Sequence, residues 1–130
     1  FAADFKHGLK AAEEAVDSIR RNARYVIMPF PGGICRSGSK VGSLKYKLPA
    51  STNHPFCPTL RDYTSDTQVP RNVKSIYEIV INGLDLESVK KAMAEGIRAA
   101  TKVEGVVKIS AGNYGGKIGP MKIHLREIVK

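Results

Sequence analysis

The residue best suited to chemistry is Glu78, a single acid inside the otherwise apolar part of residues 74–83 (KSIYEIVING). This stretch is rich in β-branched and aromatic residues and ends in Asn82-Gly83, so the sequence predicts a β-strand closed by a turn. A strand that is apolar on both faces is normally covered on both faces, and a carboxylate there must be paired, hydrogen-bonded or protonated. Two interpretations follow: a structural ion pair with a Lys or Arg, or a proton donor or acceptor in a water-poor cleft.

A second candidate is the glycine-rich stretch 112–119 (GNYGGKIG), in which four of eight residues are glycine. Glycines permit positive φ angles and let backbone N–H groups approach a ligand, and Lys117 adds a cation. It is not a Walker A loop, because Ile118 stands where a Ser or Thr should bind magnesium. The stretch is therefore an anion-binding loop or simply a wide hairpin turn.

Other kinds of site find little support in the sequence. Cys35, Cys57, His7 and His54 lack metal-ligand spacing, so no metal site is predicted. Two cysteines are too few for a disulfide framework, and neither carries the signature of a nucleophile. The chain has no apolar run of membrane-spanning length and no signal-peptide pattern, so a cytoplasmic location is expected.

Charge is unevenly distributed along the 130 residues, which carry a formal net charge of +9 and suffice for one domain. No acid occurs between Asp17 and Asp62. The basic residues in that interval are Arg20, Arg21, Arg24, Arg36, Lys40, Lys45, Lys47 and Arg61. Such a field attracts nucleic acids, phosphorylated cofactors or polycarboxylates, and charge alone does not choose among them.

Two amphipathic helices are predicted from apolar residues at spacings of three and four. The first is capped by Asp4, and the second is capped by Asp85 and stopped by Gly105. The first apolar stripe is Phe5, Leu9, Ala12, Val16, Ile19 and Ala23; the second is Leu86, Val89, Met93, Ile97 and Ala100. Both stripes are expected to form core.

Further strands are predicted around these helices. Residues 25–28 form a short buried strand, and alternating patterns predict strands at 107–111 and 121–126, with His124 on the solvated side. Residues 31–71 are rich in Pro, Gly and Ser, with one candidate edge strand at 44–48. An ordered loop of this length is typical of a binding segment; a disordered insertion is the alternative.

The order of elements predicts an α+β fold. With one strand ahead of Phe1 it becomes βαββαβ, the ferredoxin-like split unit, whose antiparallel sheet carries two helices on one face and here an added hairpin. The chain begins without Met, which favours a piece of a longer protein; a trimmed chain is the alternative. Without that strand the sheet has open edges, so we expect more polypeptide or a partner chain to fill the gap.

Several motifs, in register over nearly all of the chain, together resemble one enzyme family. They are residues 29–34 (PFPGGI), 39–43 (SKVGS), 49–53 (PASTN), 77–83 (YEIVING) and 108–117 (KISAGNYGGK). They are similar to the C-terminal, or distal, lobe of formylmethanofuran:tetrahydromethanopterin formyltransferase. The resemblance implies that residues 1–130 are one lobe of a two-lobe, ferredoxin-like enzyme, active as a homodimer or homotetramer.

The resemblance also implies an activity in one-carbon metabolism and methanogenesis. A formyl group would move from the amine of methanofuran to a ring nitrogen of tetrahydromethanopterin, both acting as co-substrates, without a metal or prosthetic group. The implied partners are the N-terminal lobe and further copies of the enzyme, with no nucleic acid and no membrane.

The resemblance assigns roles to single residues. Glu78 matches the catalytic carboxylate, acting as a protonated acid or a hydrogen-bond partner of the oxyanion. Both carriers are anionic, so the basic, glycine-rich and hydroxyl-bearing segments are expected to bind them. The predicted substrate-binding residues are Lys40, Ser51, Thr52, Asn53, Asn113, Tyr114, Gly115, Gly116 and Lys117.

A binding domain without catalysis is the competing interpretation. Ferredoxin-like sheets can bind RNA through stacked aromatics, and Tyr25, Tyr46, Tyr63 and Tyr114 lie among lysines and arginines. Against this, Tyr77 is the lone aromatic of its strand, where an exposed pair is expected.

Overall fold

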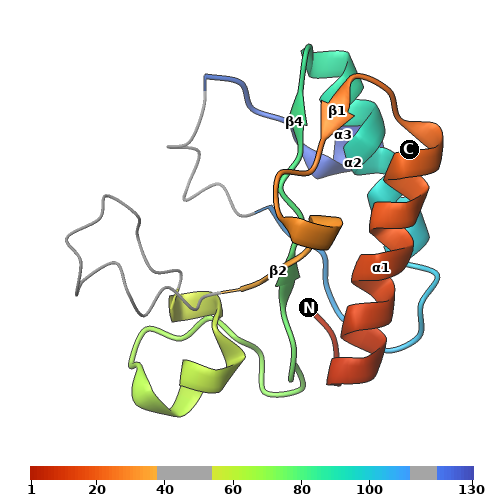
Figure 1. Cartoon of the computed structure of the whole chain (residues 1–130). Helices are drawn as coiled ribbons and strands as arrows, with labels where there is room; N and C mark the ends of the chain where they lie inside the picture. Colours follow the sequence, from red (N-terminus) through yellow and green to blue (C-terminus); the bar gives the residue numbers. More distant parts are fainter. Residues whose placement is uncertain (38–53, 112–119) are drawn as a thin grey trace.

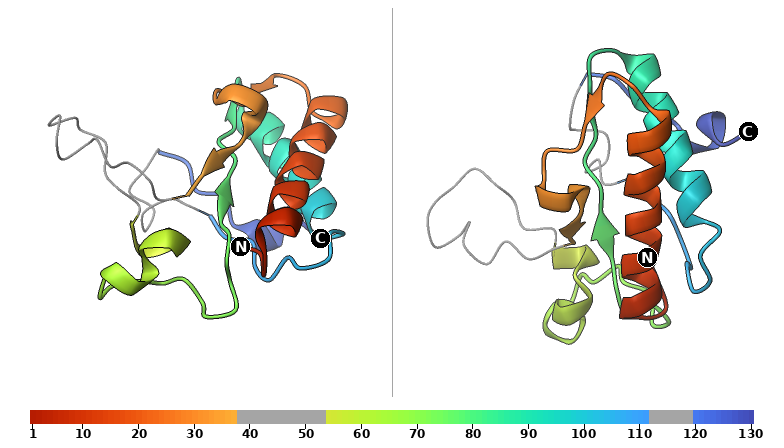
Figure 2. Two further views of the ribbon diagram at one scale, coloured as in Figure 1. Left: turned by 60° about the horizontal axis from the view of Figure 1, so that its bottom comes forward. Right: turned by 45° about the vertical axis from the view of Figure 1, so that its right-hand side comes forward.

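The computed structural model describes residues 1–37, 54–111 and 120–130 as an α+β fold (Figure 1). Its elements in chain order are α1 (Phe5–Asn22), β1 (Val26–Ile27), η1 (Pro31–Gly33), β2 (Cys35–Arg36), η2 (His54–Phe56), η3 (Pro58–Tyr63), β3 (Tyr77–Glu78), β4 (Asn82–Gly83), α2 (Leu86–Ala100) and α3 (Leu125–Ile128), the η elements being 3₁₀ helices. Helices α1 and α2 pack against each other on one side of the extended segments, as the views in Figures 1 and 2 agree.

Helix α1 begins where the sequence predicts. The Asp4 carboxylate accepts a hydrogen bond from the His7 backbone N–H at 2.8 Å, which satisfies one of the free amides of the first turn. The predicted apolar stripe is partly wrong, because Phe5 and Leu9 are 58% and 41% exposed. The buried face is instead made of small residues and two larger ones, Gly8, Ala11, Ala12, Ala15, Val16 and Ile19.

Helix α2 is capped as predicted by Asp85, whose carboxylate accepts from the Ser88 N–H at 2.7 Å. It lies close to α1 at Gly96, where an added Cβ would stand 2.9 Å from Cδ1 of Ile19. The prediction that Gly105 stops this helix is wrong. The helix ends at Ala100, and Gly105, at φ +83°, forms a later turn.

The strands form two antiparallel pairs. β1 pairs with β4 (Val26 opposite Gly83), and β2 pairs with β3 (Cys35 opposite Glu78). The predicted turn at Asn82-Gly83 is wrong, because these residues continue the extended chain and pair with β1. The first predicted strand is confirmed at Val26–Ile27, but Ile27 is 65% exposed, so this strand is not buried.

Two predicted strands are not formed by the described residues. Residues 107–111 are not assigned as a strand, although the N–H groups of Val107 and Lys108 donate to the Phe1 carbonyl at 2.9 and 3.4 Å. The neighbouring Val106 forms an isolated antiparallel bridge with Ala2. In 121–126 the alternating pattern ends in α3, whose N-cap position is held by His124, exposed as expected. Alternation gives a strand only where a neighbour supplies hydrogen bonds. The candidate strand at 44–48 and the glycine-rich stretch 112–119 lie outside the described residues.

Residues 54–71 follow an ordered course, as the binding-segment interpretation expects. Nε2 of His54 contacts Oδ2 of Asp66 at 2.8 Å, and Arg61 Nη1 donates to the Pro70 carbonyl at 2.8 Å. A small core of Val69, Val73 and Ile76, packed against Phe1 and Phe56, ties this segment to the strand that carries Glu78.

Candidate functional site

Glu78 lies at the end of β3, where β2 holds its backbone in place. The pairing of Cys35 with Glu78 and of Arg36 with Tyr77 fixes the direction of both side chains. Tyr77 points toward α1, since its Cε2 atom would lie 3.1 Å from a Cβ added to Gly8. Because successive side chains of a strand point to opposite faces, Glu78 points away from α1.

Ser37 holds the Glu78 carboxyl in position. Its hydroxyl donates a hydrogen bond to Oε1 of Glu78 at 2.7 Å, although 41 positions separate the two residues. Ser37 is only 1% exposed, and its N–H donates to the Ile76 carbonyl at 3.1 Å, which continues the β2–β3 ladder. A buried side chain has few accessible rotamers, so this contact restricts where the carboxyl can lie.

Cys35 also lies next to Glu78 across the strand pair. Its Sγ lies 3.5 Å from the Glu78 carbonyl oxygen, as a weak thiol donor. The next residue, Arg36, donates a hydrogen bond from Nη2 to the Thr59 hydroxyl at 3.2 Å. This bond connects β2 to η3. Glu78 therefore stands on a strand pair that is anchored to the ordered loop.

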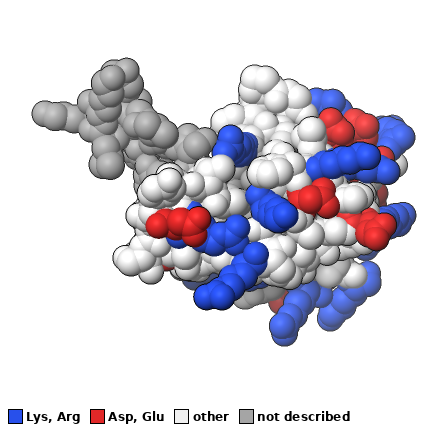
Figure 3. Space-filling view, turned by 90° about the horizontal axis from the view of Figure 1, so that it is seen from below, with Lys and Arg blue, Asp and Glu red and all other residues white. Residues whose placement is uncertain are grey.

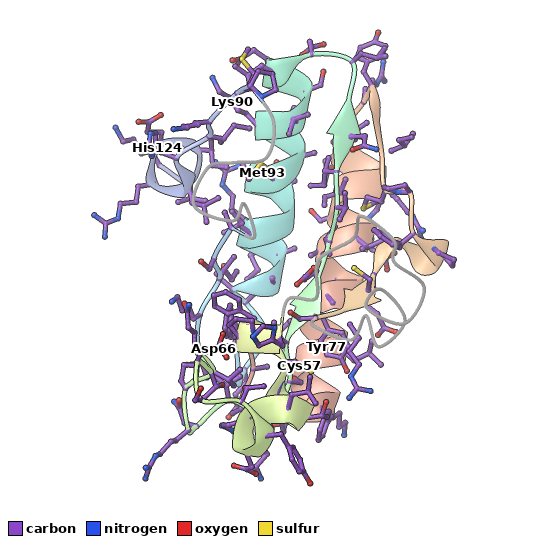
Figure 4. All side chains as sticks on the ribbon, turned by 90° about the vertical axis from the view of Figure 1, so that its left-hand side faces the viewer. Cys57, Asp66, Tyr77, Lys90, Met93 and His124 are labelled. Atoms are coloured by element: carbon purple, nitrogen blue, oxygen red, sulfur yellow. The ribbon has the colours of Figure 1, made fainter. Side chains whose placement is uncertain are left out.

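Glu78 also lines a groove of about 410 Å³ between the strand residues 75–81 and the extended residues 106–111. Apolar side chains of α2, among them Val89, Met93 and Ile97, line it as well. Figure 4 shows Met93 on α2 and Tyr77 on the strand, with the helix visible between the two extended segments. Glu78 is thus half-buried and is one of the residues that line this groove.

A carboxyl in these surroundings can act in proton transfer. A hydroxyl both donates and accepts, so Ser37 can hold the carboxylate and the carboxylic acid in the same place. An apolar site strengthens a hydrogen bond from the acid to a developing oxyanion, because little water competes for it.

The other residues predicted for the site lie outside the described residues. They are Lys40, Ser51, Thr52, Asn53, Asn113, Tyr114, Gly115, Gly116 and Lys117. In the part of the chain that is described, no group of three or more His, Cys, Asp or Glu side chains is arranged to hold a metal ion. Among the same residues, no helix is both long and apolar enough to cross a membrane.

Sequence reasoning missed Ser37 and Cys35 as parts of this site. Both lie in the Pro-, Gly- and Ser-rich segment that was expected to be irregular, and β2 is only two residues long. The sequence signal for β2 is the pair Ile34-Cys35 directly after two glycines. In the structure, Gly32 and Gly33 form a turn with φ angles of +70° and +82°. Two β-formers are too short a run to predict a strand.

The candidate site of this α+β chain is therefore a half-buried carboxyl that accepts a hydrogen bond from a buried serine, beside a strand pair and two packed helices. Comparison with known proteins gives the family. The family model described as "FTR, proximal lobe" matches residues 1–128, so the chain belongs to the FTR family. The expectation of a distal lobe is wrong, because the model that matches is that of the proximal lobe.

The curated relatives are named as formyltransferases. The formylmethanofuran–tetrahydromethanopterin formyltransferase of Methanothermus fervidus is 61% identical over 121 residues, covering 92% of this chain and 40% of the relative. That of Archaeoglobus fulgidus is 58% identical with the same coverage. The chain thus spans about 40% of the length of the curated relatives it matches.

Solved structures agree with the sequence relatives. The formyltransferase of Methanosarcina barkeri superposes with a TM-score of 0.87 at 53% identity, covering 98% of this chain and 43% of that one. The formyltransferase/hydrolase complex FhcABCD of Methylorubrum extorquens, in complex with methylofuran, gives a TM-score of 0.85 at 38% identity, covering 99% and 42%.

Proposed function

We propose that this chain is a lobe of an enzyme that transfers a formyl group between methanofuran and tetrahydromethanopterin. The observation that carries the proposal is the half-buried Glu78 carboxyl, fixed by Ser37 at 2.7 Å, in a chain that belongs to the FTR family. Relatives at 58% and 61% identity bear this activity in their names.

The chemistry requires a proton at a defined place. Formyl transfer between two nitrogens passes through a tetrahedral oxyanion, and the departing amine must gain a proton. Glu78, as the acid, hydrogen-bonds the oxyanion or protonates that amine; Ser37 keeps the carboxyl aimed during the transfer. Acid–base groups suffice for acyl transfer of this kind, so we propose that no prosthetic group takes part.

We further propose a cleft that binds the two carriers. Its residues are Lys40, Ser51, Thr52, Asn53, Asn113, Tyr114, Gly115, Gly116 and Lys117. Support comes from the anionic character of both carriers and from the acid-free, basic composition between Asp17 and Asp62. A relative was solved with methylofuran bound, which is consistent with a carrier site in this family.

The larger assembly is also a proposal. We place residues 1–130 in the C-terminal lobe of a two-lobe enzyme with a ferredoxin-like sheet, supported by two helices on one side of antiparallel strands. The second lobe and a homodimer or homotetramer would cover exposed apolar side chains such as Phe5. We also propose a cytoplasmic location, which the small number of cysteines, two in 130 residues, favours.

The test is Glu78→Gln in the full-length enzyme, because glutamine keeps the size and one hydrogen-bond acceptor but cannot supply the proton. We expect kcat to fall about 100- to 10,000-fold while KM for both carriers changes little. The matched control is Glu104→Gln, an exposed acid in the turn after α2, which should leave both constants unchanged. A near-normal kcat in correctly folded Glu78→Gln would overturn the proposal.

Binding of RNA is not favoured by the structure. Tyr25 directly precedes β1, and Tyr63 is the last residue of η3; they are 66% and 84% exposed. These two elements lie at opposite ends of the fold (Figure 1). They cannot form one stacking platform. On the face shown in Figure 3, acidic and basic side chains are interspersed, whereas a polyanion footprint would be of one sign.

A further inference from the structure

Val80 stands beside Glu78 on the same face of the extended segment. Tyr77 lies toward α1, and a Cβ added to Gly83 would stand 2.5 Å from Cγ2 of Val89 on α2, so the odd-numbered positions face the helices. Because successive side chains point to opposite faces, Glu78 and Val80 both point away from the helices, with their Cα atoms about 7 Å apart. Val80 is 37% exposed, so an apolar side chain is available next to the carboxyl.

The two strand pairs leave an interruption at Val80. Cys35 lies opposite Glu78 in one pair, and Ile27 lies opposite Asn82 in the other. Neither pair includes Val80, which falls between them. Figure 1 shows β1 and β2 as two separate arrows along one long extended segment.

The chain between β1 and β2 leaves the ladder at this point. Residues 28–34 make this excursion, and their buried residue is Gly33. A Cβ added to Gly33 would stand 3.0 Å from Cγ2 of Val16, so the excursion packs on α1 there. The contact lies on the helix side of the ladder, opposite to the face that carries Glu78 and Val80.

Three side chains therefore surround the interruption on the face of Glu78. Val80 is the diagonal neighbour of both Cys35 and Ile27, and diagonal neighbours in an antiparallel pair are within reach of a common aromatic group. Ile27 is 65% exposed and Cys35 is half-buried. The surroundings suit a flat apolar ring that carries a polar reacting group toward the carboxyl.

Only one direction along this face is open to such a ring. On the other side of Glu78 the same face carries Ile76, which is 4% exposed and belongs to the core with Val69 and Val73. A group attached to a substrate whose reacting atoms lie at Glu78 must therefore extend toward Val80.

We propose that Val80, Ile27 and Cys35 seat the furan ring of the formyl donor while its formamide lies at Glu78. This inference rests on the proposed function, which brings the formamide to the carboxyl. The ring is joined to the formamide nitrogen through one methylene group, so it cannot lie far from the reacting atoms, and the next side chain on this face is Val80. A relative was solved with methylofuran, a carrier named for the same ring. Val80 is thus a specificity-determining residue for the donor.

The first experiment compares Val80→Ala with Leu84→Ala in the full-length enzyme. Val80→Ala should raise KM for formylmethanofuran about 5- to 20-fold through the loss of buried methyl groups, while kcat at saturation and KM for tetrahydromethanopterin stay nearly unchanged. Leu84 lies further along the same face and is 83% exposed, so Leu84→Ala is the matched control and should change none of these constants. An unchanged KM in active Val80→Ala, or an equal rise in both variants, overturns the proposal.

A binding measurement separates the ring seat from the proposed function. N-furfurylformamide, which contains only the ring and the formamide, is titrated into the full-length enzyme with labelled Ile, Leu and Val methyl groups. The methyl resonances of Val80 and Ile27 should shift in a saturable manner, and those of Leu84 should not. Glu78→Gln should keep these shifts, because the ring contacts need no proton.

The two proposals can fail independently. Formyl transfer by the wild type without shifts at Val80 and Ile27 would refute the ring seat and leave the proposed function standing. Saturable shifts at both residues in an enzyme without transfer activity would do the reverse. If Val80→Ala weakens the association of subunits in sedimentation while KM stays constant, the face is a protein interface and the ring seat is refuted.

Discussion

The Ser37 hydroxyl donates to Oε1 of Glu78 at 2.7 Å across a strand pair that joins distant parts of the chain. The donor is 1% exposed and its acceptor is half-buried, so little water competes for the bond. Among the contacts of the described residues, this one most directly links the fold to the proposed chemistry.

Removing that hydroxyl should slow the reaction while leaving substrate binding intact. A hydrogen bond to a charged group contributes about 1.5–3 kcal/mol, which corresponds to about 10- to 100-fold in kcat for Ser37→Ala if the bond aims the carboxyl in the transition state. Steady-state kinetics of the full-length enzyme would show the loss in kcat with KM nearly constant. Equal kcat in Ser37→Ala and wild type would show that Ser37 is only a packing residue. The control is Ser65→Ala, because Ser65 is exposed and does not line the groove.

Gly8 should not tolerate a methyl group, although it lies inside a helix. A Cβ there would come 2.2 Å from Oγ of Ser75, which is buried and donates to the Asp4 carbonyl at 2.8 Å. Alanine gains about 1 kcal/mol of helix propensity, but the overlap should cost more, giving a net loss of about 1–3 kcal/mol in Gly8→Ala. Urea denaturation measures it.

The control for Gly8 is Gly96→Ala. Its added Cβ would meet the end of the Ile19 side chain at 2.9 Å, and a terminal methyl can rotate away. We expect its free energy of unfolding to stay within about 1 kcal/mol of wild type. Equal losses in the two variants would contradict the assignment of Ser75 as the obstacle.

Ile19 should contribute far more to stability than Leu9, although the sequence places both on one apolar stripe. Ile19 is 1% exposed and Leu9 is 41% exposed. Ile19→Ala should lower the free energy of unfolding by about 2–5 kcal/mol through lost burial and a cavity at the α1–α2 contact. Leu9→Ala should cost less than about 1 kcal/mol. Thermal and urea unfolding would be compared; a Leu9→Ala loss as large as that of Ile19→Ala would mean that α1 buries a different face.

The cap of α2 should make stability depend on acid pH. Hydrogen bonds from the Ser88 N–H and hydroxyl lower the pKa of Asp85 below its usual 3.8. A depressed acid stabilises the folded state above the unfolded-state pKa, and this contribution is lost as pH falls through the folded-state pKa. Asp85→Asn keeps an acceptor for the Ser88 N–H but does not titrate, so its stability should fall less steeply below pH 3.8. Identical slopes for wild type and variant in pH-dependent unfolding would contradict this.

The helices illustrate what local sequence can predict. Asp4 and Asp85 cap α1 and α2 as expected, because a cap needs only a short polar side chain and the amides two or three residues ahead. The buried face of α1 was harder to predict from sequence. Whether Leu9 or Ala11 is buried depends on how closely α2 approaches α1, and the close approach occurs at Gly96.

The sequence by itself determined an α+β chain with two capped helices and one acid embedded in an apolar strand, since period, capping and composition act over a few residues. Only the tertiary structure decided that Ser37 meets Glu78, that Asn82-Gly83 pairs with β1 instead of turning, and that residues 107–111 face a groove. Strand pairing brings together segments tens of residues apart, and a two-residue strand leaves no periodic pattern by which its partner could be predicted.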